Sequence, residues 1–221
     1  MATAILRRVG AVLVVVGLID IAVMIYCIVN RISYTSSFNI FAVIVGIFLL
    51  CGSLRAASIV RWLSAFFLGG VITALIALPF LQPLDLTRTQ FRLNPLAFLA
   101  AVAIGAFVLC LLIWVTRELG SQPVQAALAS AGIKRRSMRI PAVAGVGLVV
   151  VLSIFLVVLL QLGDTAEHAE SIAQRELGAG YHFHVRSLNI VEKSGVKSVS
   201  GVVTAWNENE VIDVPVHWEE Q

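Results

Sequence analysis

Long apolar runs separated by short polar segments make up most of the chain. The last of these runs contains nineteen uninterrupted apolar or small residues, Ala142 to Leu160. A helix needs about 20 residues to cross roughly 30 Å of hydrocarbon at about 1.5 Å per residue. The pattern therefore predicts a membrane all-α bundle of five transmembrane helices within residues 1–162, at approximately 9–29, 38–54, 59–81, 96–116 and 141–162. The second run is the shortest.

The pattern changes after Gly163. Apolar positions keep helical spacing from Thr165 to Leu177, and Gly178 and Gly180 then end the helix. Three segments typical of strands follow, separated by two turn-like tripeptides: Tyr181–Val191, Val196–Trp206 and Glu210–Trp218, with Lys193-Ser194-Gly195 and Asn207-Glu208-Asn209 between them. Residues 163–221 are thus predicted to form a small α+β domain, with one helix on a three-stranded antiparallel meander.

The connections between the apolar runs carry their own signals. Asn94-Pro95 predicts the start of the fourth helix, with Asn as the cap and Pro at the first position. The preceding segment, Gln82–Asn94, is polar and is predicted to be a loop. Between the fourth and fifth runs, one apolar face predicts a short helix opened by Ser121 and Pro123 and closed by Gly132, with Val124, Ala127, Leu128 and Ala131 on that face.

Composition agrees with a membrane protein. Of the 221 residues, 59% are hydrophobic and 13% charged, and the mean hydropathy is +0.93. Soluble domains contain about 45–50% apolar and about 25% charged residues. The lipid bilayer is therefore the first expected partner of this chain.

Charge is distributed unevenly and predicts an orientation. From Asp164 onward there are four basic and ten acidic residues. Nine basic residues fall on the predicted inner side and three in the outer loops: Arg7, Arg8, Arg55, Arg61, Arg117, Lys134, Arg135, Arg136 and Arg139 against Arg31, Arg88 and Arg92. The positive-inside rule then places the N-terminus in the cytoplasm and residues 163–221 outside. We expect a multi-pass protein of the plasma (bacterial inner) membrane with a periplasmic domain. The basic residues reflect this topology and do not indicate a nucleic-acid partner.

Motifs that carry chemistry are absent from the sequence. It contains no nucleophile elbow, P-loop, dinucleotide fingerprint, HExxH or pair of catalytic carboxylates. Its three cysteines lie inside apolar segments and form no CxxC motif. We therefore predict no enzymatic activity and no cofactor. An enzyme that acts on lipid or cell-wall material stays open as a third alternative.

Asp20 is the one acidic residue near the middle of a predicted span. A carboxylate there costs about 2.5–3.5 kcal/mol on insertion scales. Residues at 3-4 spacing place it on a seam that also holds both glycines of the span: Gly10, Leu13, Gly17, Asp20, Met24 and Cys27. One interpretation is a protonatable site in a solute path. The simpler interpretation is a packing carboxyl that forms a hydrogen bond at similar depth with Thr73 or Ser153.

Histidines of the C-terminal domain offer a second candidate site. His182 and His184 alternate along the first predicted strand and share a face, and His217 lies in the third. Three histidines suit zinc or copper. In a meander, however, the second strand would separate the first and third by about 9.5 Å. Because no metal-spacing motif accompanies them, histidines on a solvated face are the simpler interpretation.

Three functional hypotheses follow from these observations. The first is a non-enzymatic integral membrane protein whose outward domain binds a protein partner, or a second copy of the chain, in the assembly or regulation of a membrane complex. Free strand edges are the reason for this hypothesis, because an edge accepts a partner strand. The second is a small transporter or channel that uses Asp20. The third is the membrane enzyme named above.

Overall fold

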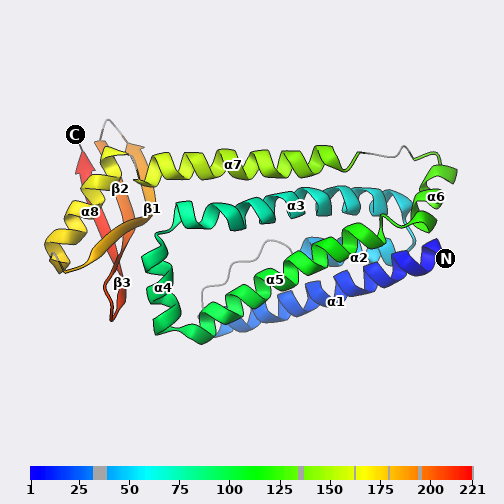
Figure 1. Ribbon diagram of the computed structural model, residues 1–221, viewed down its shortest axis with the longest axis horizontal. Coiled ribbons are helices and arrows are strands. Elements are labelled where there is room, and N and C mark those ends of the chain that lie inside the picture. The colour runs from blue at the N-terminus through cyan, green and yellow to red at the C-terminus, as the bar shows by residue number, and fades with distance from the viewer. Residues whose placement is uncertain (32–38, 134–136, 162, 179, 194–195, 221) are drawn as a thin grey trace. The chain divides into compact units, whose positions relative to one another are not determined.

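The computed structural model describes residues 1–31, 39–133, 137–161, 163–178, 180–193 and 196–220. These residues are mostly helical and end in a three-stranded antiparallel sheet (Figure 1). The helices are α1 (Ala2–Val29), α2 (Asn39–Leu50), α3 (Leu54–Leu81), α4 (Leu84–Leu93), α5 (Pro95–Glu118), α6 (Gln122–Ser130), α7 (Arg139–Gln161) and α8 (Asp164–Leu177). The strands are β1 (His182–Lys193), β2 (Val196–Trp206) and β3 (Val211–Glu220).

Four helices in the described part of the chain are long and apolar enough to cross a membrane. They are Ala2–Val29, Leu54–Leu81, Pro95–Glu118 and Arg139–Leu160. The helix found in the second predicted span, 38–54, is shorter than predicted, because α2 has 12 residues and extends about 18 Å. Gly52, whose φ is +77°, ends α2. Ser53 caps the next helix, because its Oγ accepts a hydrogen bond from the Ala56 N–H. Helix α3 therefore begins five residues before the predicted Ile59.

The prediction of a polar loop at Gln82–Asn94 is wrong, because this segment contains the helix α4. Its first turn carries Asp85 and its last turn Arg92, and these charges match the helix dipole. Leu86 is buried. The predicted start of the next helix is confirmed, because α5 begins at Pro95 and the Ala97 N–H donates to Asn94 Oδ1 at 3.4 Å.

The chain divides into two compact units. The first unit comprises Met1–Val71 and Phe107–Val146, and the second comprises Ile72–Ala106 and Gly147–Gln221. The first unit has a core that we call the helix-end cluster: Leu6, Val9, Leu49, Ala57, Val60, Val115, Leu119, Val124 and Leu128. The short helix predicted after Ser121 is confirmed as α6, whose Val124 and Leu128 are buried in this cluster.

Glycines bring the helices of the first unit into close backbone contact. A Cβ at Gly10 of α1 would lie 2.6 Å from the carbonyl oxygen of Gly46 in α2. A Cβ at Gly145 of α7 would overlap the carbonyl group of Phe66 in α3. Small residues at such crossings permit van der Waals contact between backbones, which drives helix association in lipid. A larger side chain at either glycine must therefore separate its helix pair.

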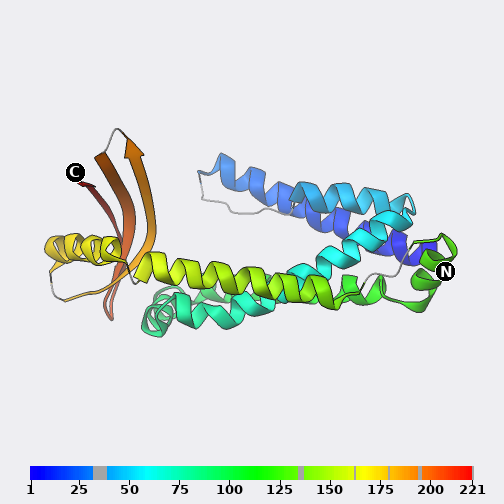
Figure 2. The same cartoon turned by 90° about the horizontal axis from the view of Figure 1, so that it is seen from above.

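The C-terminal domain lies within the second unit and has the predicted topology. Strand order β1-β2-β3 with antiparallel pairing confirms the meander, and α8 packs on one face of the sheet (Figures 1 and 2). Ala166, Ala169 and Ala173 of α8 are buried against that face. The predicted turn at Asn207 is confirmed, since its Oδ1 accepts the N–H groups of residues 209 and 210 at 2.8 and 3.0 Å. The tip residues 194–195 of the other predicted turn lie outside the described residues.

A β-bulge interrupts β1 at Arg186. Val185 pairs with Val203, whereas Ser187 pairs with Val202, so Arg186 is the extra residue. A bulge shifts the alternation of side chains by one position. As a result Val185 and Leu188, three residues apart, both contact the core under α8.

Candidate functional site

One concave site lies within the second unit. It is a cavity of about 550 Å³ on the face of the sheet opposite α8. Its volume falls in the range of about 300–1,000 Å³ typical of ligand pockets. One wall is the sheet, and the other is formed by the final turns of α3 and α7 together with α4.

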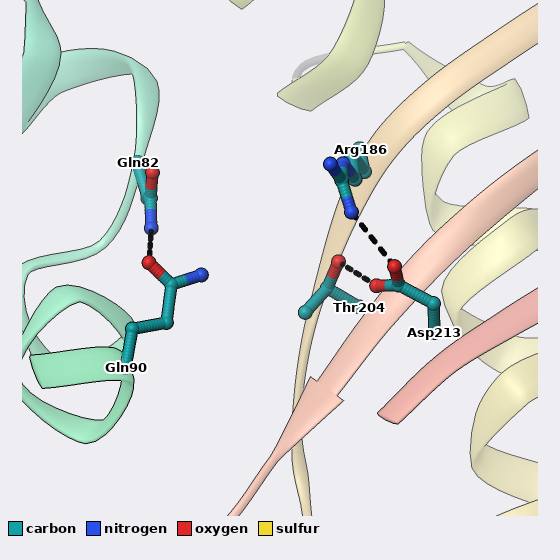
Figure 3. A network of polar contacts seen from close by, with 5 residues as sticks. All are labelled: Gln82, Gln90, Arg186, Thr204 and Asp213. Carbon is teal, nitrogen blue, oxygen red and sulfur yellow. Dashed lines mark hydrogen bonds and ion pairs between the residues drawn. The ribbon is translucent and has the colours of Figure 1, made fainter. Parts of the chain in front are cut away.

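The sheet wall is polar. His184 pairs with Thr204 and Thr204 pairs with Asp213, so these three residues form a row across the strands that we call the polar row. The Thr204 hydroxyl donates to Asp213 Oδ1 at 2.7 Å, and Arg186 Nη1 donates to Asp213 Oδ2 at 2.7 Å (Figure 3). Asp213 thus accepts hydrogen bonds from the buried Thr204 hydroxyl and from the guanidinium of Arg186, the extra residue of the bulge. The side chains of Arg186 and Asp213 are 67% and 45% exposed, so this ion pair contributes at most about 1 kcal/mol and mainly orients the two groups.

The helical wall is apolar except for one amide pair. Five leucines contribute to it: Leu78 and Leu81 of α3, Leu86 of α4, and Leu156 and Leu160 of α7. Gln82 Nε2 donates to Gln90 Oε1 at 3.0 Å, and this bond ties the end of α3 to α4 (Figure 3). The cavity therefore has one wall of leucines and one wall of hydrogen-bonding groups. An amphipathic ligand has the same two parts, one apolar and one polar.

His184 is half-buried in this cavity. Burial lowers the pKa of its imidazole below the usual value, and a hydrogen bond to the Leu81 backbone opposes that shift in part. The imidazole is therefore neutral at pH 7. His184 is less exposed than expected for a solvated face, because the last turn of α3 lies against it.

The other predicted histidine ligands are not assembled with it. His182 is exposed, with its ring centroid 5.6 Å from that of Trp206. His217 is exposed and pairs with Ser200, four positions along β2 from the partner of His184. Within the described ranges no three His, Cys, Asp or Glu side chains come close enough to hold a metal ion.

The predicted intramembrane polar residues fall in both units. Asp20 is half-buried in α1, in the first unit. The seam predicted for it agrees with burial, since Gly10 and Gly17 are buried and Leu13, Met24 and Cys27 are half-buried. Thr73 and Ser153 are half-buried in the second unit. A hydrogen bond from Asp20 to either of them therefore stays a prediction.

Apart from His184, sequence reasoning missed the polar residues that line the cavity. Arg186, Thr204 and Asp213 are polar, but each of their strands contains other polar residues, so polarity alone does not single them out. Their association needs the strand register and the bulge, and neither follows from the pattern of polar positions. Gln82 and Gln90 were missed because α4 was taken for a loop.

Comparisons with known proteins found no significant match. No family model matches the chain, and neither a curated protein nor a solved structure is significantly similar to it. The functional argument therefore rests on the residues and geometry of this chain.

Proposed function

We propose that this chain is a non-enzymatic integral membrane protein that crosses the membrane five times, with its N-terminus in the cytoplasm. Its C-terminal domain lies outside and binds a partner protein by strand addition, in the assembly or regulation of a membrane complex. The observation that carries the proposal is the β1 edge of the sheet, where Ile190 and Val191 are exposed beyond the bulge at Arg186.

The packing of α2 supports five crossings. Gly46 of α2 lies against Gly10 of α1, and Leu49 joins Leu6 in the helix-end cluster. The chain has thus returned to the starting end of α1 before α3 begins, although α2 itself extends only about 18 Å. We therefore keep the second crossing at the predicted 38–54, with α2 as its described helix.

Charge supports the orientation. The end of α1 that carries Arg7 and Arg8 also lies beside the end of α5, where the Arg8 guanidinium is 6.0 Å from the Trp114 ring. Arg55 and Arg117 belong to the helix ends that meet in the same cluster. Basic residues gathered at one set of helix ends, with an aromatic residue among them, are typical of a cytoplasmic interface.

The two edges of the sheet differ in protection. In the part of the chain that the structure describes, β1 and β3 are the edge strands. Strand β3 carries Pro215 and the exposed Asp213 and Glu219, which are the features that block pairing with another strand. Strand β1 has no charged residue between Arg186 and Glu192, and Ile190 and Val191 are 41% and 52% exposed. The β1 edge is the better acceptor for a partner strand.

Site-specific photo-crosslinking in cells tests this assignment. A benzophenone amino acid at Val191 on β1 should give a defined adduct, and the same group at His217 on β3 should not. An adduct of twice the mass of the chain would identify the partner as a second copy. Lysine at Ile190 should abolish the Val191 adduct, whereas lysine at His217 should leave it intact. Equal adducts from both edges, or none from β1, would refute strand addition.

A second candidate function is transport of a small ion or solute. It rests on Asp20, a half-buried carboxyl on the packed seam of α1. Intramembrane acids of this kind mark proton and cation paths. Substitution by asparagine separates this function from a packing role, as argued below.

A further inference from the structure

The position of the cavity relative to the apolar helices limits what can enter it. Leu78 and Leu81 are in the last turn of α3, and Leu156 and Leu160 are in the last turns of α7. Both helices are candidate membrane spans. In the proposed membrane arrangement, the leucine wall lies at the ends of two spans, where hydrocarbon gives way to lipid head groups. Molecules present at that depth have acyl chains on one side and a polar group on the other.

The polar wall carries a guanidinium and a carboxylate side by side. The Arg186 guanidinium has five N–H donors, and among the described residues one of its nitrogens is bonded to Asp213, so donors are left for a phosphate. The Asp213 carboxylate is 45% exposed and faces the cavity. Because His184 is neutral, the two charges of the wall balance. A balanced pair suits a head group that carries one charge of each sign better than one with a net negative charge.

We propose that this cavity binds one zwitterionic glycerophospholipid, with its phosphate on Arg186, its ammonium group near Asp213 and an acyl chain along the leucine wall. Gln82 and Gln90 then face the glycerol region from the helical side. The proposal uses the location of the cavity at the helix ends and is independent of a partner strand on β1.

Native mass spectrometry of the full-length protein, delipidated in detergent, tests the site with phosphatidylethanolamine and phosphatidylglycerol as probes. We expect one phosphatidylethanolamine to bind more tightly than phosphatidylglycerol. Leu156→Trp fills the cavity and should weaken this binding about tenfold or more, since a blocked pocket loses its contacts. Leu152→Trp is the matched control one turn earlier on α7, outside the cavity lining, and should not change it.

The head-group contacts have their own variants. Arg186→Gln should weaken phosphatidylethanolamine about tenfold, the cost of one charge-assisted hydrogen bond. Arg175→Gln, an exposed position on α8, is its control. Asp213→Asn leaves a net positive wall and should reverse the preference toward phosphatidylglycerol, whereas Glu176→Gln on α8 should not.

These outcomes decide the proposal even where one variant fails to fold. Circular dichroism checks folding, and if Leu156→Trp is unfolded the Arg186 and Asp213 pairs carry the test. Equal losses in Leu156→Trp and Leu152→Trp indicate lipid bound around the helices and overturn the proposal. Tighter binding of phosphatidylglycerol by the wild type, or an unchanged preference in Asp213→Asn, also overturns it.

Discussion

The first unit is held by backbone contacts between helices, whereas the second contains a sheet with one apolar and one polar face. Helices of the first unit meet at Gly10, Gly46, Gly69 and Gly145, and they share the apolar helix-end cluster. The sheet buries alanines and valines under α8 and presents the polar row on the other face. The first design suits a medium in which apolar burial gives no driving force between helices. The second design suits a boundary, where one face must be solvated or meet a polar ligand.

The units also differ in charge. The first contains ten basic and two acidic residues, and the second contains six basic and eleven acidic residues. This difference has the sign that the proposed orientation requires, with the basic residues inside. The two units therefore differ both in how they pack and in the sign of their net charge.

Accessibility labelling gives the largest expected effect, because its outcome is all or none. In a background without the native cysteines, Glu208→Cys should react with an impermeant maleimide in intact spheroplasts. Ser137→Cys should react only after lysis. Both positions are exposed, so accessibility within the fold does not limit either reaction. The reverse pattern would mean that the basic unit faces outward, and labelling of both sites in intact cells would remove the asymmetry.

Substitution of a packing glycine gives the next largest effect. Gly145→Leu must push α7 away from the Phe66 carbonyl group of α3, at an expected cost of about 1–3 kcal/mol or more. Gly147→Leu, two residues along the same helix, meets no atom within 4 Å and should be nearly neutral. Thermal unfolding in detergent measures both. Similar melting temperatures for the two variants would show that close backbone contact does not hold the first unit together.

The same contrast explains how much of the fold the sequence predicted. The spacing of apolar residues and the helix caps depend on residues that are close in sequence. The long helices, α6, α8 and the meander could therefore be predicted from their own segments. Helix α4 was missed because it is short and its polar composition resembles a loop, although its apolar side chains lie on one face. The cavity was missed because it joins residues distant in the chain, such as Leu81 and His184. The bulge at Arg186 has no local signature, since no glycine or proline marks it.

Substitutions at Asp20 test whether the seam of α1 in the first unit serves only to pack helices together. Asp20→Leu removes a hydrogen-bonding group from the seam and should cost about 0.5–2 kcal/mol of stability in detergent, the usual range for interhelical hydrogen bonds. Asp20→Asn is nearly isosteric and should preserve both stability and function if the carboxyl packs helices. If it carries protons or cations, Asn should instead abolish flux into proteoliposomes while the melting temperature is unchanged. That second result would replace partner binding by transport as the leading function.

His184 gives the smallest effect and tests the boundary face of the second unit. Burial lowers its pKa in the folded chain, so between that value and the unfolded pKa of about 6.5 the unfolded chain binds more protons. Its contribution to stability is therefore complete above about pH 6.5 and is lost as the pH falls through the unfolded value toward the folded one. The raised pKa of Glu170, caused by burial and by Glu167, acts with the opposite sign. Because the two contributions oppose each other, the test compares how the stability of two variants changes with pH.

His184→Gln cannot titrate and should lose less stability than the wild type between pH 7 and pH 5. His217→Gln is the control, because His217 is exposed on the same sheet. Urea unfolding of the full chain in detergent at several pH values measures the slope, and the Glu170 contribution cancels in the difference. If His184→Gln and His217→Gln had the same pH slope, the imidazole would be solvated. The end of α3 would then not cover the sheet, and the cavity would lose its helical wall.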